Sequence, residues 1–344
     1  MCEGTEAVER WLETGAASRR TAPLGRCRVT GPIYRGRHST LFAAHCSGVP
    51  VPAVVKVCRD PRTGAPDEEG AVEQYSALER VAERWPPGTP HHCPRPFALY
   101  ADRAMLVMER VDGPSLTRRL SAWRTGPAEA DRLLHSAGAW LATFHHAHSS
   151  PPAPLELSRK AVVVDGMADW PAAVLPGFRR AAEILARTLP VAKASPVAGS
   201  WVHGDFKADN VIAGPRGPVG IDYLLRHRDA VVYDMGSFLN HLDLSALDPR
   251  NLRVAAARRR WAGRFLDGYA AATEEAVPVV ALAWTRLYQL LHLWNSAVGA
   301  SRGVSLRRWL LGRAFETVAG ELGGVLAGGP VDDVALRDSS RRAG

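Results

Sequence analysis

The polar side chains with the greatest chemical potential gather in one short stretch, residues 201–222, whose sequence is WVHGDFKADNVIAGPRGPVGID. The stretch contains a histidine, a lysine and an amide, and two of its three carboxylates are well separated: His203, Lys207, Asn210, Asp205 and Asp222. Phosphoryl transfer from ATP requires a carboxylate that accepts the proton of the attacking hydroxyl and a cation that stabilises the moving phosphoryl group. It also requires an amide and a second carboxylate that hold magnesium. This stretch therefore contains the side chains that such chemistry needs.

Apolar runs and a turn would position these side chains. Trp201 and Val202 precede the histidine, and Val211 with Ile212 follows the amide. A Gly/Pro turn then leads into a second apolar run, which ends at Ile221. This pattern is typical of a loop followed by a strand, a tight turn and another strand, with the polar groups at one end. A generic polar loop between two strands is the alternative interpretation.

The spacing of the polar residues resembles the H-x-D-x-K-x-x-N catalytic loop of the protein-kinase-like fold. Gly204 in place of arginine is similar to the variant found in the aminoglycoside phosphotransferase and choline kinase family. The resemblance implies that Asp205 is the catalytic base and that Lys207 lies near the transferred phosphate. It also implies that Asn210 and Asp222 hold Mg²⁺, with Asp222 in the role of the kinase D-F-G aspartate.

The segment that follows, YLLRHRDAVVYDMGSFLNHL, contains one further family element. The family usually has Gly-Asp-Pro and then Asp-Leu-Ala; residues 228–230 (Arg-Asp-Ala) replace the first, and residues 234–236 (Asp-Met-Gly) fit the second. The resemblance implies that Asp234 is a buried carboxylate bracing the catalytic loop, and that His203 is a second structural support. Tyr-Leu at 223–224 replaces Phe-Gly, so there is no sign of a regulated activation segment, which disfavours a protein kinase.

Lysine is rare in this chain, so each lysine is informative. Of 43 basic residues only four are lysine: Lys56, Lys160, Lys193 and Lys207. A lysine retained among so many arginines suggests a need for a compact ammonium group. Lys56 lies within the apolar run Val-Val-Lys-Val, where it would be unfavourable unless paired or pointing into a cleft. It resembles the V-A-I-K lysine that holds the α- and β-phosphates of ATP, and an exposed lysine on an edge strand is the alternative.

Two further segments correspond to the phosphate-binding part of the family. The loop GPIYRGRHST (31–40) is at the position of the phosphate-covering loop and supplies hydroxyl groups, including that of Ser39. An ordinary hairpin is the alternative for this loop. The apolar spacing over 67–84 predicts a helix. In the family, a glutamate of this helix pairs with the strand lysine; we assign that role to Glu73, with Glu69 as the alternative.

The segment Glu109-Arg-Val-Asp-Gly resembles the hinge between the lobes of a kinase. The resemblance implies that backbone groups of Glu109 and Val111 meet the adenine ring, so that side-chain identity matters little there.

The predicted fold is α+β and two-lobed, like that of protein kinases, with a small antiparallel sheet lobe and a larger, mostly helical lobe. Strands are expected at about 27–30, 40–46, 52–58, 97–100 and 104–108, which gives a five-stranded sheet with one helix. The predicted domains are an N-terminal nucleotide-binding lobe with a leading helix (1–112), a catalytic and substrate-binding lobe (113–325), and a flexible tail (326–344).

Composition limits the other classes of protein. The chain has 344 residues and no apolar run near the roughly 18 residues of a membrane span. Its five cysteines are odd in number and form no Cys-x-x-Cys pair, which argues against both a zinc site and a disulfide framework. We therefore expect a reduced, cytoplasmic protein. Net charge is +8, but the arginines are scattered without interleaved aromatic residues, so a nucleic-acid partner is not expected.

The helical segment 276–315 gives a hint about the acceptor. It contains no Asp or Glu, whereas its aromatic and basic residues include Trp284, Tyr288, Trp294 and Trp309 with Arg286 and Arg302. A polycationic aminoglycoside would need converging carboxylates. The segment therefore favours a neutral or anionic hydroxyl compound, and plain core packing of the aromatic residues is the alternative.

Together these features predict an ATP- and Mg²⁺-dependent phosphotransferase that acts on the hydroxyl group of a small molecule and is a monomer or a homodimer. A catalytically inactive nucleotide-binding module is the first alternative. It is disfavoured because a module without catalysis needs neither a base nor two metal ligands.

Overall fold

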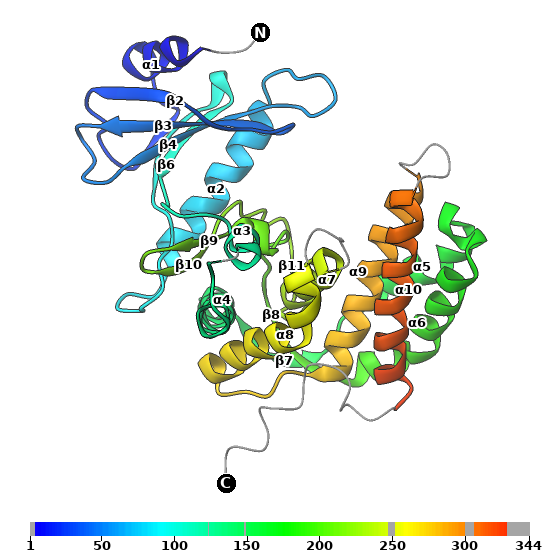
Figure 1. Ribbon diagram of the computed structural model, residues 1–344. Helices are drawn as coiled ribbons and strands as arrows, with labels where there is room; N and C mark the ends of the chain where they lie inside the picture. Colours follow the sequence, from blue (N-terminus) through cyan, green and yellow to red (C-terminus); the bar gives the residue numbers. More distant parts are fainter. Residues whose placement is uncertain (1–3, 123, 148, 247–251, 300–305, 329–344) are drawn as a thin grey trace. The chain divides into compact units, whose positions relative to one another are not determined.

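The computed structural model describes residues 4–122, 124–147, 149–246, 252–299 and 306–328 (Figure 1). The chain divides into two compact units. The first comprises residues 1–113 together with the short segment 221–224, and the second comprises residues 114–220 and 225–344. The region beyond residue 328, which covers most of the expected tail, lies outside the described residues.

The first unit is built around one antiparallel sheet of six strands, in the order β1-β5-β6-β4-β3-β2. The sheet was expected to have five strands; the sixth is the two-residue strand β1, which pairs with β5. The elements of this unit are α1 (Thr5–Thr14), β1 (Arg19–Arg20), β2 (Cys27–Arg35), β3 (Ser39–Cys46), β4 (Ala53–Cys58), α2 (Glu68–Arg84), β5 (Pro96–Tyr100), η1 (Ala101–Arg103) and β6 (Met105–Glu109).

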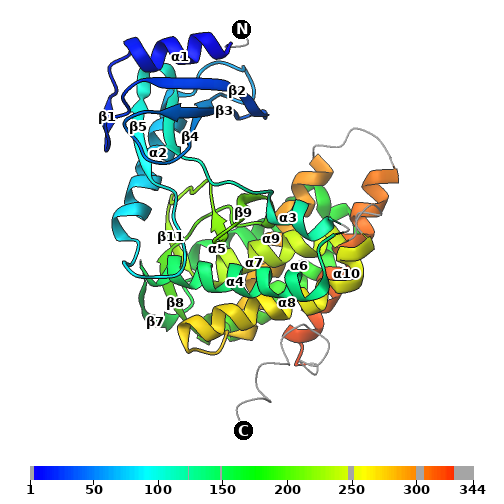
Figure 2. The same cartoon turned by 60° about the vertical axis from the view of Figure 1, so that its left-hand side comes forward.

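Both faces of this sheet are covered, α1 lying on one side and α2 on the other (Figures 1 and 2). Val55 packs in the same core as Val8 of α1, whereas Cys58 packs in the same core as Tyr75 of α2. A strand buried on both faces has a continuous apolar run and not an alternating one, which explains the sequence of β4. Lys56 is two residues from Cys58, so it lies on the face that α2 covers, and it is only 6% exposed.

Cys27 and Cys46 form a disulfide, which corrects the expectation of a reduced chain without disulfides. The two residues are directly opposite each other in the antiparallel pair β2–β3, with Cα atoms 4.0 Å apart. The number and spacing of cysteines were a poor guide because the pairing depends on strand register, which places distant residues side by side. Cys58 and Cys93 are free thiols, and both are buried.

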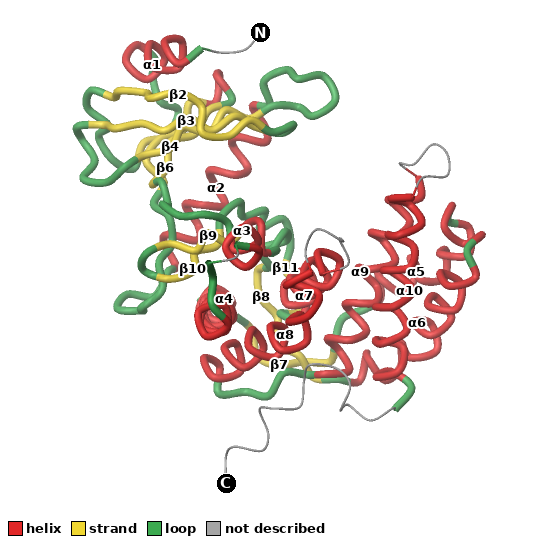
Figure 3. Tube along the Cα trace, in the orientation of Figure 1, coloured by secondary structure: helices red, strands yellow, loops and turns green. Residues whose placement is uncertain are grey.

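The second unit is mostly helical, as the red tube in Figure 3 shows. Its strands form a two-stranded sheet, β10-β9, and a three-stranded sheet, β11-β8-β7. Its elements are α3 (Leu116–Ser121), α4 (Pro127–His146), β7 (Ser150–Pro154), α5 (Ser158–Asp165), η2 (Gly166–Asp169), η3 (Pro171–Val174), α6 (Pro176–Ala194), β8 (Pro196–Trp201), η4 (Ala208–Asn210), β9 (Val211–Gly214), β10 (Gly217–Gly220), β11 (Arg228–Ala230), α7 (Val232–Ala246), α8 (Leu252–Thr273), α9 (Val279–Gly299) and α10 (Leu306–Leu326). No helix in the described part of the chain is both long and apolar enough to cross a membrane.

The hairpin expected after the catalytic loop is confirmed. β9 and β10 pair antiparallel, and Gly214 is opposite Gly217, which adopts a φ of +111° that favours glycine. β8 ends at Trp201, so the polar residues 203–210 lie in the connection between β8 and this hairpin.

Two glycines allow α4 and α8 to approach closely. A Cβ atom at Gly138 would lie 2.0 Å from the carbonyl oxygen of Phe265, and one at Gly268 would lie 1.9 Å from that of His135. Neither position could accept a side chain without moving a helix backbone. This contact fixes the two helices that carry His145 and Tyr269, which are part of the site described next.

Candidate active site

Three of the catalytic-loop residues come together in the second unit. Lys207 Nζ donates to both carboxylate oxygens of Asp205, at 3.1 and 2.8 Å. Asn210 Nδ2 donates to Asp205 Oδ2 at 2.8 Å and to the backbone carbonyl of Asp205 at 2.9 Å. Two donors therefore orient the Asp205 carboxylate, which stays accessible to a ligand because its side chain is 41% exposed.

The geometry of Asn210 suits a metal ligand. Its amide nitrogen faces Asp205, so its amide oxygen points away from that carboxylate. This oxygen makes no hydrogen bond with the described residues. Amide and carboxylate oxygens, completed by phosphate oxygens and water, are the usual protein-derived ligands of Mg²⁺. Asn210 therefore fits the magnesium role inferred from the sequence.

Asp234 supports the start of the catalytic loop from behind. It lies in the first turn of α7 and is fully buried. Its Oδ2 accepts from the backbone N–H of His203 at 2.6 Å, and its Oδ1 accepts from that of Gly204 at 3.0 Å. Gly204 has a φ of +85°, so glycine in place of the kinase arginine suits this turn.

A chain of hydrogen bonds continues from Asp234 to α8. His145 Nε2 lies 3.0 Å from Asp234 Oδ2, and His145 Nδ1 lies 3.0 Å from the hydroxyl oxygen of Tyr269. Burial alone would raise the pKa of Asp234. The hydrogen bond and charge of His145, the charge of His203 and the N–H of Gly204 outweigh burial, so the pKa is lowered. Asp234 is thus held as a carboxylate in the core.

The first unit contains the other two charged residues of the predicted site. Lys56 Nζ donates to Asp222 Oδ1 at 2.6 Å, and the two side chains are 7% and 42% exposed. Asp222 has a φ of +63°, a conformation that non-glycine residues rarely adopt and that is enriched at functional positions. Burial raises the pKa of Cys58, on the same face of β4 as Lys56, to about 11, although the charge of Lys56 acts to lower it.

The glutamate partner of Lys56 stays a prediction. Glu73 lies on α2 with an exposed side chain, and Glu69, one turn earlier, is exposed as well. The ion pair described for Lys56 is the one with Asp222.

The remaining predicted nucleotide contacts lie at the ends of β3 and β6. Ser39 begins β3 and is buried, where its backbone oxygen accepts from the N–H of Gly36 at 2.9 Å. Val111 follows β6, and its backbone makes no hydrogen bond with the described residues. The side chain of Glu109 is buried, and it accepts from His92 Nε2 and Arg95 Nε, each at 3.0 Å.

An ion pair that sequence reasoning did not identify joins α5 to β11. Lys160 Nζ donates to both oxygens of Asp229, at 2.8 and 2.6 Å, and lies 5.7 Å from the ring centre of Tyr233. Both charged side chains are mostly buried, at 14% and 13% exposed. The available signal was the scarcity of lysine, which singles out Lys160 as it does Lys56 and Lys207.

Most of the α9 residues considered for acceptor binding are core residues instead. Trp284 and Trp294 are buried, and Arg286 is buried in an ion pair with Asp243. Tyr288 is partly buried and stacks on Trp284 at a ring separation of 5.7 Å. Arg302 and the side chain of Trp309 lie outside the described part of the chain.

Residues 52–277 match the family described as the phosphotransferase enzyme family. No curated protein matches the chain.

Three solved structures have the same fold. A choline/ethanolamine kinase family protein from Mesorhizobium loti is 11% identical, with a TM-score of 0.59 over 94% of this chain and 98% of that one. A glucosamine kinase is 18% identical, with a TM-score of 0.57 over 94% and 86% of the two chains. The ADP-bound aminoglycoside phosphotransferase APH(2'')-Ib is 15% identical, with a TM-score of 0.51 over 93% and 98%. These likenesses establish the fold as that of the protein-kinase-like small-molecule kinases.

Proposed function

Since the chain belongs to the phosphotransferase enzyme family and has the fold of small-molecule kinases, we propose that it transfers the γ-phosphate of ATP to a hydroxyl group of a small organic acceptor. The observation that carries this proposal is the arrangement of Asp205, which is oriented by Lys207 and Asn210 and is accessible. A carboxylate fixed in this way suits the positioning of a hydroxyl nucleophile.

In the proposed reaction, Asp205 accepts the proton of the acceptor hydroxyl as its oxygen attacks phosphorus. Lys207, bonded to the same carboxylate, supplies positive charge beside the attacked phosphoryl group. Asp234 acts only as a positioning residue, because it contacts the backbone of the loop and not the reacting atoms.

We propose that the nucleotide is held by the residues to which the sequence assigns this role. Val111 offers backbone groups to adenine, and Lys56 offers an ammonium group to the α- and β-phosphates. Asn210 and Asp222 would hold Mg²⁺, which when bound neutralises charge on the β- and γ-phosphates. Lys56 already donates to Asp222, so the phosphates and this carboxylate would share the ammonium group of Lys56.

The ion pair on β11 bears on the charge of the acceptor. The pKa of Tyr233 is raised, chiefly by burial and then by the carboxylates of Asp234, Asp229 and Asp205, so Tyr233 is within electrostatic reach of the proposed base. A carboxylate beside an aromatic face is a typical site for a cationic group. Here Lys160 already occupies that position. We therefore propose that the acceptor is a neutral or anionic hydroxyl compound, not a polycation.

The test of transfer is phosphate incorporation from γ-labelled ATP into a panel of sugars, sugar acids, amino alcohols and aminoglycosides. We expect label on a neutral or anionic acceptor, and a loss of transfer of at least about a hundredfold in Asp205→Asn, since a general base contributes roughly 10²–10⁴-fold. Equal transfer in this variant would contradict the role of Asp205.

A variant of Lys160 tests the acceptor charge separately. Lys160→Met frees the Asp229 carboxylate, so KM for amino alcohols should fall relative to KM for sugars. Lys193→Met is the matched control, because Lys193 is an exposed lysine on α6. Unchanged preference in Lys160→Met, or efficient phosphorylation of an aminoglycoside by the unmodified enzyme, would contradict the proposed charge class.

A further inference from the structure

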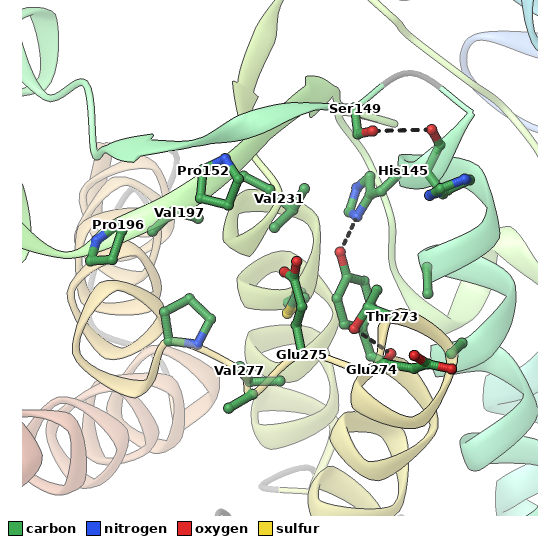
Figure 4. Close-up of a pocket in the computed structure, with 18 of the residues that line it drawn as sticks. His145, Ser149, Pro152, Pro196, Val197, Val231, Thr273, Glu274, Glu275 and Val277 are labelled. Carbon is green, nitrogen blue, oxygen red and sulfur yellow. Dashed lines mark hydrogen bonds between the residues drawn. The ribbon is translucent and has the colours of Figure 1, made fainter.

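A cavity of about 510 Å³ lies in the second unit, between the β7–β8 pair and the connection from α8 to α9. Figure 4 shows Pro152, Val197 and Val231 along one side, with the carboxylate of Glu275 in the middle of the labelled residues. His145, on α4, also lines the cavity. The cavity therefore adjoins the chain of hydrogen bonds that holds the catalytic loop.

The charge of the lining is opposite to that of the protein. The chain has a net charge of +8, yet the residues around the cavity include Glu274 and Glu275 and neither lysine nor arginine. Neither carboxylate has an ion pair or hydrogen bond among the described residues. Clefts lined by one sign of charge concentrate ligands of the other sign. A cation is thus the electrostatic complement of this cavity.

The rest of the lining is suited to an apolar group. Four prolines, at positions 151, 152, 196 and 278, line it together with Val197, Val231 and Met235. A few polar groups within an apolar wall are typical of small-molecule sites. A bare metal ion would leave this apolar wall unused. The combination favours an organic ammonium ion that carries an aromatic or aliphatic body.

Tyr269 connects the cavity with the catalytic loop. The Asp234 carboxylate can only accept hydrogen bonds, so His145 donates from Nε2. When the imidazole is neutral, its Nδ1 accepts from the hydroxyl of Tyr269, and lone pairs of the tyrosine oxygen stay available to a donor. Burial raises the pKa of Tyr269, and the charges of Asp234 and Glu275 raise it further, which places Glu275 within electrostatic reach of this hydroxyl.

We propose that this cavity binds a small organic ammonium ion with an apolar body. The ammonium group lies between Glu275 and the hydroxyl of Tyr269, and its presence is transmitted to the backbone of Gly204 through His145 and Asp234.

The binding half is tested with benzylamine as the probe and benzyl alcohol as its neutral counterpart. Calorimetric titration of the full chain, without ATP, should give saturable binding of benzylamine and none of benzyl alcohol. Glu275→Gln should weaken benzylamine binding by up to about fivefold, since an exposed ion pair contributes at most about 1 kcal/mol. Glu183→Gln, at an exposed glutamate of α6, should leave the affinity unchanged. Absence of benzylamine binding, or equal affinities in the two variants, would overturn the proposal.

The transmission half is tested by nuclear magnetic resonance. Saturation with benzylamine should shift the amide resonance of Gly204, as well as the imidazole nitrogens of His145. Tyr269→Phe should still bind benzylamine, because Glu275 is unchanged, but should lose the shift at Gly204. A Gly204 resonance that does not move in the wild type, or moves equally in Tyr269→Phe, would refute the connection. None of these measurements involves phosphate transfer, so their failure is distinguishable from failure of the proposed function.

Discussion

Replacing Asp234 by asparagine should remove the support on which the start of the catalytic loop depends. If the new amide oxygen takes the place of Oδ2, it still accepts from His203 and His145, but as a neutral group. The amide nitrogen then faces the N–H of Gly204, which loses its partner inside the core. An unsatisfied buried donor costs about 1–3 kcal/mol, and each weakened bond costs about 0.5–1.5 kcal/mol more. The unfolding free energy should therefore fall by about 4 kcal/mol, a value in the range for breaking a buried charge pair.

Thermal unfolding followed by calorimetry at neutral pH measures this loss. In a unit of this size, about 1 kcal/mol corresponds to roughly 2–4 °C, so the melting temperature of Asp234→Asn should fall on the order of 10 °C. Asp209→Asn is the matched control: its carboxylate is 53% exposed, is 3.2 Å from His241 Nε2 and contributes at most about 1 kcal/mol. If Asp234→Asn melts as close to the wild type as this control, the carboxylate does not hold the loop and the reasoning is wrong.

Three further predictions concern nucleotide binding, thiol reactivity and pH. Lys56→Met should weaken Mg²⁺–ATP binding by about tenfold or more in calorimetric titration. Lys56→Arg should not restore the affinity, because the planar guanidinium does not fit a compact ammonium site. Full affinity in Lys56→Arg would count against the proposed binding of phosphate by the Lys56 ammonium group. Burial raises the pKa of Cys58 to about 11 and that of Cys93 to about 12. Iodoacetamide should therefore alkylate neither thiol at mildly alkaline pH until the protein unfolds. Mass-spectrometric mapping that finds either thiol modified in the folded protein would disprove this prediction. The pKa of Asp234 is lowered from 3.8, so the stabilisation that its carboxylate provides is present above pH 3.8 and is lost as the pH falls through the lower pKa of the folded state. The difference in melting temperature between the wild type and Asp234→Asn should therefore stay constant down to about pH 4 and then become smaller. A difference that already becomes smaller near pH 6 would refute this prediction.

The catalytic loop could be predicted from the sequence because its contacts are local. Asp205, Lys207 and Asn210 are separated by only a few residues, so their spacing in the sequence determines most of the geometry that the structure describes. The hairpin that follows was equally local, since a Gly/Pro turn between two apolar runs specifies antiparallel pairing. The continuous apolar runs of β4 and β5, which are buried on both faces, also explain why these strands of the sheet lobe could be placed.

Contacts between residues that are far apart in the sequence could not be predicted. The disulfide depends on the register of β2 and β3, and the burial of Arg286 depends on Asp243, which lies 43 residues earlier. The link from Asp234 to Tyr269 needs α4 and α8 to touch at their glycines. Sequence spacing contains no information on which helices meet, so each of these groups could be identified by type but not by partner.

The scarcity of lysine connects the predicted and the unpredicted parts of the site. Three of the four lysines donate to an aspartate at 2.8 Å or less: Lys56 to Asp222, Lys160 to Asp229 and Lys207 to Asp205. The fourth, Lys193, is exposed on α6. An ammonium group presents its charge at one point and needs little room, whereas the planar guanidinium is wider. The first and the last of these pairs involve residues that we propose to meet ATP, where a carboxylate must also remain open to a metal ion or a proton. The same reasoning applied to Lys160, which is mostly buried against Asp229, supports our proposal that it contributes to acceptor choice.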